Sequence, residues 1–117
     1  MHDFFEALQK FLNEEGTMNI YYEEASKEAS FPYGVISNPT ETFLRYGTLI
    51  YFDINIWSKD PEVGISLEKK VDNLINLLDR KLFSDVGAVI YFEDQKPVDD
   101  PEYELVKKQI TFSVRKF

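Results

Sequence analysis

The segment from Tyr46 to Trp57 alternates between apolar and polar side chains, and this pattern constrains the fold more than any other feature of the chain. On an extended strand, successive side chains point to opposite faces. One face would carry Ile50, Phe52, Ile54 and Ile56, and the other would carry Tyr51, Asp53, Asn55 and Trp57. The alternation predicts a long antiparallel strand. It carries no catalytic group, so it informs on the fold rather than on chemistry.

Two amphipathic helices are predicted on either side of this strand. The first begins at Asp3, which can cap it, and runs to about Glu15, where Gly16 ends it. The second runs from Ile65 to Phe83. Its apolar residues recur at three- and four-residue steps, at Leu67, Val71, Leu74, Ile75, Leu78 and Leu82. A face of this breadth predicts a helix that covers a sheet.

Two short strands are predicted before the central one. They are Asn19–Glu23 and Phe31–Ser37, and Pro32 suits a strand start or edge better than a sheet centre. A turn is predicted at Asn38-Pro39-Thr40, because the residue before a proline is disfavoured in the helical region. The central strand would follow this turn.

Two more strands are predicted after the second helix. Gly87–Glu93 is almost wholly apolar and should be buried on both faces. Tyr103–Phe117 alternates between apolar and polar side chains and should have one solvent-exposed face. The prolines and acids of Asp94–Pro101 predict a loop between them. The expected fold is therefore an α+β class with the order α-β-β-β-α-β-β. It would have a mostly antiparallel sheet of about five strands, with both helices packed on one face.

The composition predicts one packed, soluble domain over residues 1–117. Hydrophobic residues make up 44% and charged residues 29% of the chain, which is ordinary for a globular protein. There is no cysteine, which excludes a disulfide scaffold, a thiolate zinc site and a cysteine nucleophile. The acidic start is unlike a targeting segment, and no apolar run approaches the ~18 residues of a membrane span.

The sequence contains no motif that usually carries enzyme chemistry. The single histidine, His2, lies beside the terminal methionine, where catalytic geometry is hard to maintain. The acidic stretch Asp94–Glu104 lacks the ordered ligands and the glycine of an EF-hand loop, and no phosphate-binding motif occurs. We expect no catalytic residue, no cofactor and no metal site. A metal-assisted enzyme would require the acids of Asp94–Glu104 to converge.

Charge is segregated along the chain. The net charge of −8 disfavours nucleic-acid binding, since DNA is held chiefly by Lys and Arg. All 21 acidic residues precede Leu105. The segment from Leu105 to Phe117 contains basic residues and no acidic ones. The basic strand either folds back on acidic parts of its own chain or meets the acidic surface of another subunit. The candidate interface residues are Lys107, Lys108, Arg115 and Lys116 with Asp94, Asp99, Asp100, Glu23 and Glu24.

Aromatic residues make up 15% of the chain. Stacking on single-stranded nucleic acid requires a positive groove around such residues. Several of them lie among acids instead, namely Tyr51, Trp57, Tyr91 and Tyr103. They are therefore expected to pack in the core or on the sheet, or to form a protein interface, where Tyr and Trp are enriched.

With these elements placed, the segment Ile20–Asp60 resembles the tail terminator (tail completion) proteins of long-tailed bacteriophages and related prophages. The resembling motifs are the acidic Tyr22–Ser26, the strand Phe31–Val35, the strand end Asp53–Trp57, the helical Asp72–Ile75 and the strand Val89–Glu93. They are spread along the chain, so that the likeness covers most of it, and Ser26 stands where the family pattern has proline. None of them is a catalytic signature.

The resemblance implies a non-enzymatic virion assembly protein whose copies form a ring, usually a hexamer, on the finished tail tube. Such a ring stops tube elongation and presents the head-joining surface. The implied partners are further copies of the chain, the tail tube protein and a head completion or connector protein, with no membrane and no specific nucleic acid. The implied location is the host cytoplasm during assembly and then the virion. Two alternatives are a head-completion or neck protein of the same virion, and a small protein-binding module that acts by strand addition.

Overall fold

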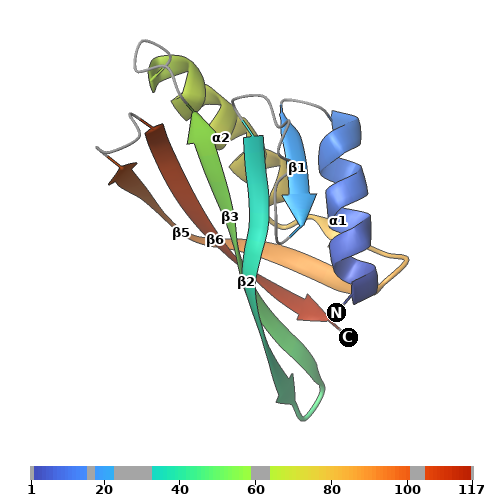
Figure 1. Cartoon of the computed structure of the whole chain (residues 1–117). Helices are drawn as coiled ribbons and strands as arrows, with labels where there is room; N and C mark the ends of the chain where they lie inside the picture. The colour runs from blue at the N-terminus through green and yellow to red at the C-terminus, as the bar shows by residue number, and fades with distance from the viewer. Residues whose placement is uncertain (1, 16–17, 23–32, 59–63, 101–104, 117) are drawn as a thin grey trace.

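The computed structural model describes residues 2–15, 18–22, 33–58, 64–100 and 105–116. These residues form two helices and six strands (Figure 1). In chain order they are α1 (His2–Glu15), β1 (Asn19–Tyr22), β2 (Tyr33–Leu44), β3 (Gly47–Ser58), α2 (Gly64–Leu78), β4 (Leu82–Phe83), β5 (Ala88–Asp100) and β6 (Leu105–Lys116). The sequence also predicts a polar loop at Glu24–Ser30 and a short break from Ser58 to Gly64. The loop lies outside the described residues, and so do residues 59–63 of the break.

The strands form one curled, mixed sheet that closes to a half-barrel, in the order β1-β2-β3-β6-β5-β4. The predicted fold of about five mostly antiparallel strands in the order α-β-β-β-α-β-β is therefore wrong. β4 is an additional strand, and β1 runs parallel to β2. The curling has a local cause, because β-bulges interrupt the register of β2 between Ser37 and Thr40 and of β5 between Phe92 and Asp94. A bulge bends its strand and increases the twist of the sheet.

A single hydrophobic core lies between the inner face of this sheet and both helices. The predicted apolar face of β3 is confirmed, since Ile50, Phe52, Ile54 and Ile56 are all fully buried. On the other face Tyr51 is exposed, but Asn55 is buried and donates to Ser37 Oγ at 2.6 Å. Matching residues of β6 and both helices complete the core, among them Ile110, Phe112, Val114, Phe4, Phe5, Leu8, Leu12, Val71, Leu74 and Leu78. Aromatic rings gather at its centre. The Phe52 ring lies 5.4 Å from the Phe5 ring and 5.5 Å from the Phe112 ring, measured between centroids.

β2 continues through the predicted turn at Asn38-Pro39-Thr40, so that prediction is wrong. The proline lies in the bulge between Ser37 and Thr40, where the ladder with β3 is already interrupted. Proline has no N–H to donate, and a bulge is one of the few places in a sheet where this is tolerated. β2 therefore reaches Leu44 and pairs with β3 up to Gly47. The two strands form a long hairpin with a two-residue turn at Arg45 and Tyr46.

α2 ends at Leu78, five residues before the predicted end at Phe83. Arg80 adopts a left-handed backbone conformation, with φ of 64°, which stops the helix. Its N–H donates to the Ile90 carbonyl at 2.6 Å, so the chain turns into the sheet and forms β4. Leu82, which the helical pattern assigned to the buried face, is consequently exposed on β4.

Replacing Arg80 with glycine should stabilise the protein. A left-handed backbone costs a non-glycine residue about 1–2 kcal/mol, whereas glycine adopts it freely. Part of this gain is lost because glycine also increases the entropy of the unfolded chain. We expect a net increase of about 0.5–1 kcal/mol in the free energy of unfolding, measured by chemical denaturation. Arg80→Ala keeps the strained backbone and is the control. Equal stabilisation by alanine would contradict the backbone explanation.

β5 runs to Asp100 through most of the predicted loop Asp94–Pro101. It pairs with β6 along its whole length, and these pairs provide the hydrogen-bonding partners that the sequence alone did not reveal. The expected burial of both faces is also wrong. Ala88 and Ile90 are buried on the inner face, whereas Tyr91 is exposed on the outer one.

Candidate interaction surface

The basic residues predicted for a subunit interface lie on β6, which is an internal strand between β3 and β5. In the register with β5, Lys107 pairs with Val98, and Lys108 pairs with Pro97. The acidic residues Asp94, Asp99 and Asp100 belong to β5, so the acidic and basic segments are neighbouring strands of one chain. This placement favours the intrachain interpretation of the charge segregation. The other two candidates, Glu23 and Glu24, lie outside the described residues.

Arg115 and Lys116, at the far end of β6, lie apart from these acids. Arg115 is exposed and pairs with Leu49 of β3 and Val89 of β5. Lys116 is half-buried and pairs with Thr48 and Ala88. Both residues are therefore at the base of the β2–β3 hairpin, where the structure brings them together with residues that the sequence analysis did not single out.

The edge of the sheet at β1 is capped by a side chain of α1. The Asn13 amide accepts from the Ile20 N–H at 2.9 Å and donates to the Ile20 carbonyl at 3.2 Å. Gln9 Nε2 donates to the same carbonyl at 3.1 Å. Asn13 thus makes the two bonds that an adjoining strand would make. Such capping blocks the pairing of a further strand at this edge.

The opposite edge is protected along β5. Asp79 Oδ1 accepts from the Phe92 N–H at 2.9 Å, and Asp94 Oδ1 accepts from the Gln95 N–H at 2.8 Å. Because N–H groups point alternately to the two sides of a strand, Pro97 occupies the next outward position, and proline has no N–H. These three features remove donors that a strand added along β5 would need. Strand addition next to β1 and along this part of β5 is therefore disfavoured, whereas β2 beyond Ile36 pairs only with β3 among the described strands.

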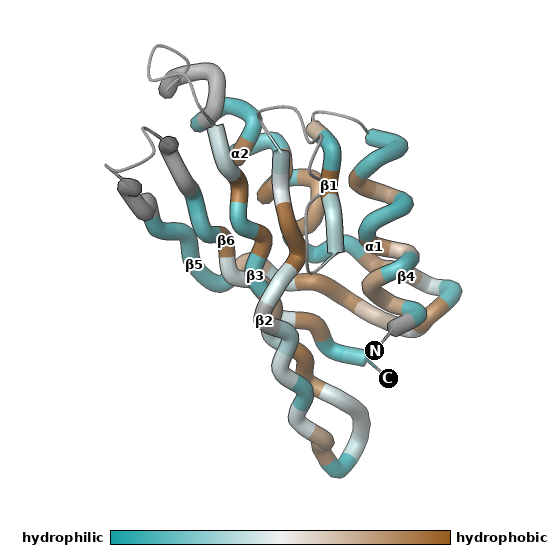
Figure 2. The backbone as a smooth tube through the Cα atoms, in the orientation of Figure 1, coloured by the Kyte–Doolittle hydropathy of each residue, from teal (hydrophilic) through white to brown (hydrophobic). Residues whose placement is uncertain are grey.

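The β2–β3 hairpin extends beyond the rest of the sheet, at the bottom of the view in Figure 1. Phe43 and Tyr46 are 80% and 81% exposed, and Leu44 is half exposed. Arg45 lies between them in sequence, with its guanidinium carbon 5.4 Å from the Tyr46 ring centroid. Hydrophobic and hydrophilic segments adjoin at this end (Figure 2). We call Phe43, Leu44, Arg45 and Tyr46 the tip surface.

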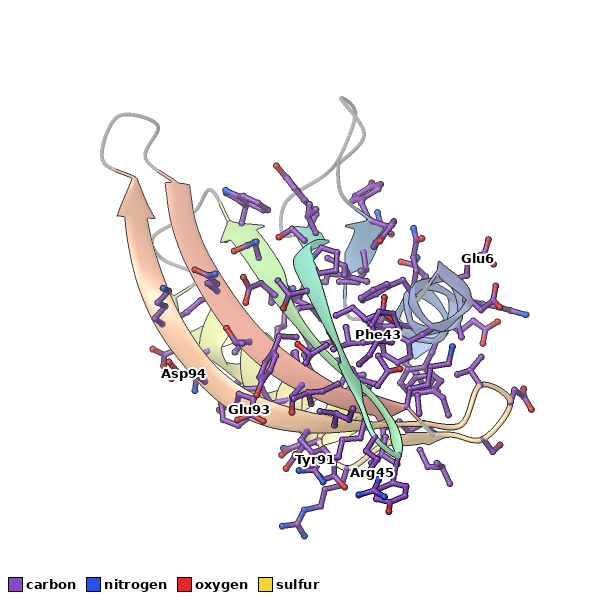
Figure 3. All side chains as sticks on the ribbon, turned by 90° about the horizontal axis from the view of Figure 1, so that it is seen from below. Glu6, Phe43, Arg45, Tyr91, Glu93 and Asp94 are labelled. Atoms are coloured by element: carbon purple, nitrogen blue, oxygen red, sulfur yellow. The ribbon has the colours of Figure 1, made fainter. Side chains whose placement is uncertain are left out.

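A hollow of about 500 Å³ lies on the outer face of the sheet, near the base of the hairpin. Two exposed tyrosines line it, together with one acid and one base. Its main lining residues are Leu49, Tyr51, Tyr91, Glu93, Ser113 and Arg115, and we call it the tyrosine hollow. Figure 3 shows Tyr91, Glu93 and Asp94 in succession along β5. Ser113 Oγ donates to Glu93 Oε1 at 2.5 Å, which fixes the carboxylate at the wall of the hollow.

A second hollow of about 330 Å³ lies at the tip surface. It is lined by Leu44 to Thr48 of the hairpin and by Arg115 and Lys116 of β6. Arg115 lines both hollows, so they are adjacent. Five of the six exposed large hydrophobic residues among those described lie on the hairpin or in the tyrosine hollow, and the sixth is Leu82. Such a concentration of exposed aromatic surface is typical of protein interaction sites.

The sequence contained one signal for the tip surface. Phe43, Leu44 and Tyr46 surround Arg45 directly before the central strand, so exposed apolar residues next to a turn could have been noticed. The predicted turn at Asn38-Pro39-Thr40 hid this signal, because it placed the end of the preceding strand too early. Tyr51 and Tyr91 were expected in the core, on the sheet surface or in an interface, and both are on the exposed outer face of the sheet, not in the core.

Within the described part of the chain, no three His, Cys, Asp or Glu side chains are grouped so that they could hold a metal ion. None of the described helices combines the length and the apolar composition of a membrane span. No protein-family model matches the sequence, and no curated protein matches it either.

Proposed function

We propose that this protein is a non-enzymatic virion assembly subunit of the tail-terminator kind. Its copies form a ring, of six subunits in the typical case, on the end of the tail tube, stop its elongation and provide the head-joining surface. The observation that carries the proposal is the tip surface, where two large aromatic side chains are almost fully exposed at the end of a projecting hairpin. A monomeric protein gains no stability from such residues.

Association through side chains agrees better with this geometry than strand addition at β1 or β5 does. Both of these edges carry capping groups, and the edge that remains among the described strands is β2 beyond Ile36, on the projecting hairpin. A cyclic assembly instead repeats one contact between two different patches of the same chain. The exposed hairpin and the tyrosine hollow are two such patches.

The partners of the ring follow from the proposed role. They are the tail tube protein on one side and a head completion or connector protein on the other, first in the host cytoplasm and then in the virion. A head-completion or neck protein of the same virion would also be a ring of small subunits. The two roles differ in the first partner, because a terminator binds purified tail tubes before any head is present.

The double variant Phe43→Ser/Tyr46→Ser tests the proposal. Interface hot spots are often large aromatics, and loss of two should weaken each contact at least tenfold. Wild-type protein should form a closed oligomer, alone at high concentration or on tail tubes, as measured by native mass spectrometry and electron microscopy. The variant should remain monomeric with an unchanged melting temperature.

Leu82→Ser is the matched control, because Leu82 is also an exposed large hydrophobic residue but lies on β4. This variant should assemble as the wild type does. A wild-type protein that stays monomeric at every concentration, and in the presence of tail tubes, would refute the proposed function. Equal loss of assembly in both variants would show that the tip surface has no special role.

A further inference from the structure

We propose that the tip surface of one copy docks in the tyrosine hollow of the next copy, with Arg45 placed against Glu93 and Asp94. This inference rests on the proposed function and names the two patches that would make the ring contact. It differs from the predicted contact through Lys107 and Lys108, which lie on β6 at the end of the sheet away from the hairpin, where they pair with Trp57 and Ile56.

The two patches lie apart on the same molecule, as a repeated head-to-tail contact requires. From the turn at Arg45 and Tyr46 to Tyr51, β3 extends about 17 Å, and β5 lies two strand spacings, or about 10 Å, to the side. The patches are thus about 20 Å apart. One copy can therefore present its tip to one neighbour and its hollow to another.

The charges of the two patches are complementary. Arg45 is the only charged residue of the tip surface. Glu93 and Asp94 are both exposed, and both lie on the outer face, since Glu93 accepts from Ser113 and Asp94 pairs with Thr111. Consecutive residues of a regular strand point to opposite faces, so only the bulge between Phe92 and Asp94 allows this pair of acids. The bulge thus places two acids next to each other on the outer face. Their negative charge complements the positive charge of Arg45 and would set the orientation of the docked copy.

The apolar parts of the two patches also match. The tyrosine hollow, with a volume of about 500 Å³, has room for an aromatic ring from the tip. Tyr51 and Tyr91 offer ring edges and faces to such a ring, and the Arg115 guanidinium can stack on it. Arg115 lines the hollow from β6, whereas Glu93 and Asp94 lie on β5. An incoming Arg45 can therefore approach the two acids on the β5 side, away from the positive charge of Arg115.

Charge reversal of each patch provides the test. Variant one is Arg45→Glu, and variant two is Glu93→Lys/Asp94→Lys. Each variant alone would set like charges against each other at every contact, so each should lose assembly by at least tenfold in concentration. An equimolar mixture should assemble again, because every tip of one variant then meets a complementary hollow of the other. Lys69→Glu, at an exposed position of α2, is the control and should assemble normally.

Native mass spectrometry of the mixture distinguishes the possible contacts. A ring with one tip-to-hollow contact per subunit must alternate the two variants, so it should contain equal numbers of each and an even total number of subunits. A closed dimer of one copy of each variant would mean that the contact is reciprocal, and this would overturn the ring geometry. If the wild type forms rings and both variants do so equally well, the inference fails although the proposed function stands. If the wild type forms no ring, the proposed function itself fails.

Discussion

Phe52→Ala should lower the free energy of unfolding by about 3–5 kcal/mol, as buried Phe-to-Ala replacements do. Phe52 is 1% exposed at the centre of β3. Its ring contacts two rings of α1, from Phe4 and Phe5, and the Phe112 ring of β6. Removing it leaves a cavity between helix and sheet that the surrounding strands cannot close. Since domains of this kind are stable by only about 5–15 kcal/mol, the variant should unfold at a much lower urea concentration.

Tyr51→Ala is the control, because Tyr51 is the adjacent residue on the exposed outer face. The same change in ring size should there cost less than about 1 kcal/mol. Urea unfolding monitored by circular dichroism measures both variants under the same conditions. Equal losses for the two would contradict the division of β3 into a buried and an exposed face.

The central strand was predictable because its pattern depends on burial alone. Phe52 and Ile54 must be apolar wherever the partner strands lie, so the alternation is visible in the sequence. The same holds for Leu8 and Leu74, which place helices against the core. The prediction failed where the local preference of a residue is outweighed by its pairing with a distant strand. Pro39 and Pro97 are usual signs of a turn or loop, but the adjoining strands keep both within the sheet.

The end of α2 could not be predicted for a different reason. Leu82 and Phe83 continue the helical spacing, and neither glycine nor asparagine occurs at the residue that stops the helix. Arg80 takes the left-handed conformation because its N–H and the Ile90 N–H both bond across to the neighbouring segment. That bonding is long-range, so a local pattern does not contain it. β4 was missed as a consequence.

The candidate site coincides only in part with the residues named from the sequence. The segregated charges drew attention to Asp94 and Arg115, whereas Glu93 and the residues of the tip surface were not among the candidates. What the sequence did not reveal is the strand order, in which β6 lies between β3 and β5. This order makes most of the basic strand internal and leaves the hairpin as the exposed element. Strand order depends on contacts between distant parts of the chain, which no single segment encodes.

Asp53→Ala should destabilise the protein by about 2 kcal/mol, the second largest effect that we expect. Asp53 lies on the outer face of β3, where its two carboxylate oxygens accept from the side chains of the adjoining β6. Gln109 Nε2 donates to Oδ2 at 2.8 Å, and Thr111 Oγ1 donates to Oδ1 at 2.7 Å. Hydrogen bonds to a charged group contribute about 1.5–3 kcal/mol each when protected, and less where water can replace them. Asp53 is half-buried, so its hydrogen bonds are only partly protected from water. We therefore expect its contribution to the free energy of unfolding to lie between that of a protected and that of a water-exposed pair.

A double-mutant cycle with Thr111→Val separates this pair from the rest of the network. If the hydrogen bond between Asp53 and Thr111 stabilises the fold, both single variants lose it. The double variant should then lose about 1 kcal/mol less unfolding free energy than the sum of the two single losses. Ser113→Ala is the comparison, because Ser113 also donates to a carboxylate, but to the exposed Glu93. It should cost less than Asp53→Ala does. Strict additivity in the cycle would mean that Asp53 stabilises the β3–β6 pair through contacts other than its bond to Thr111.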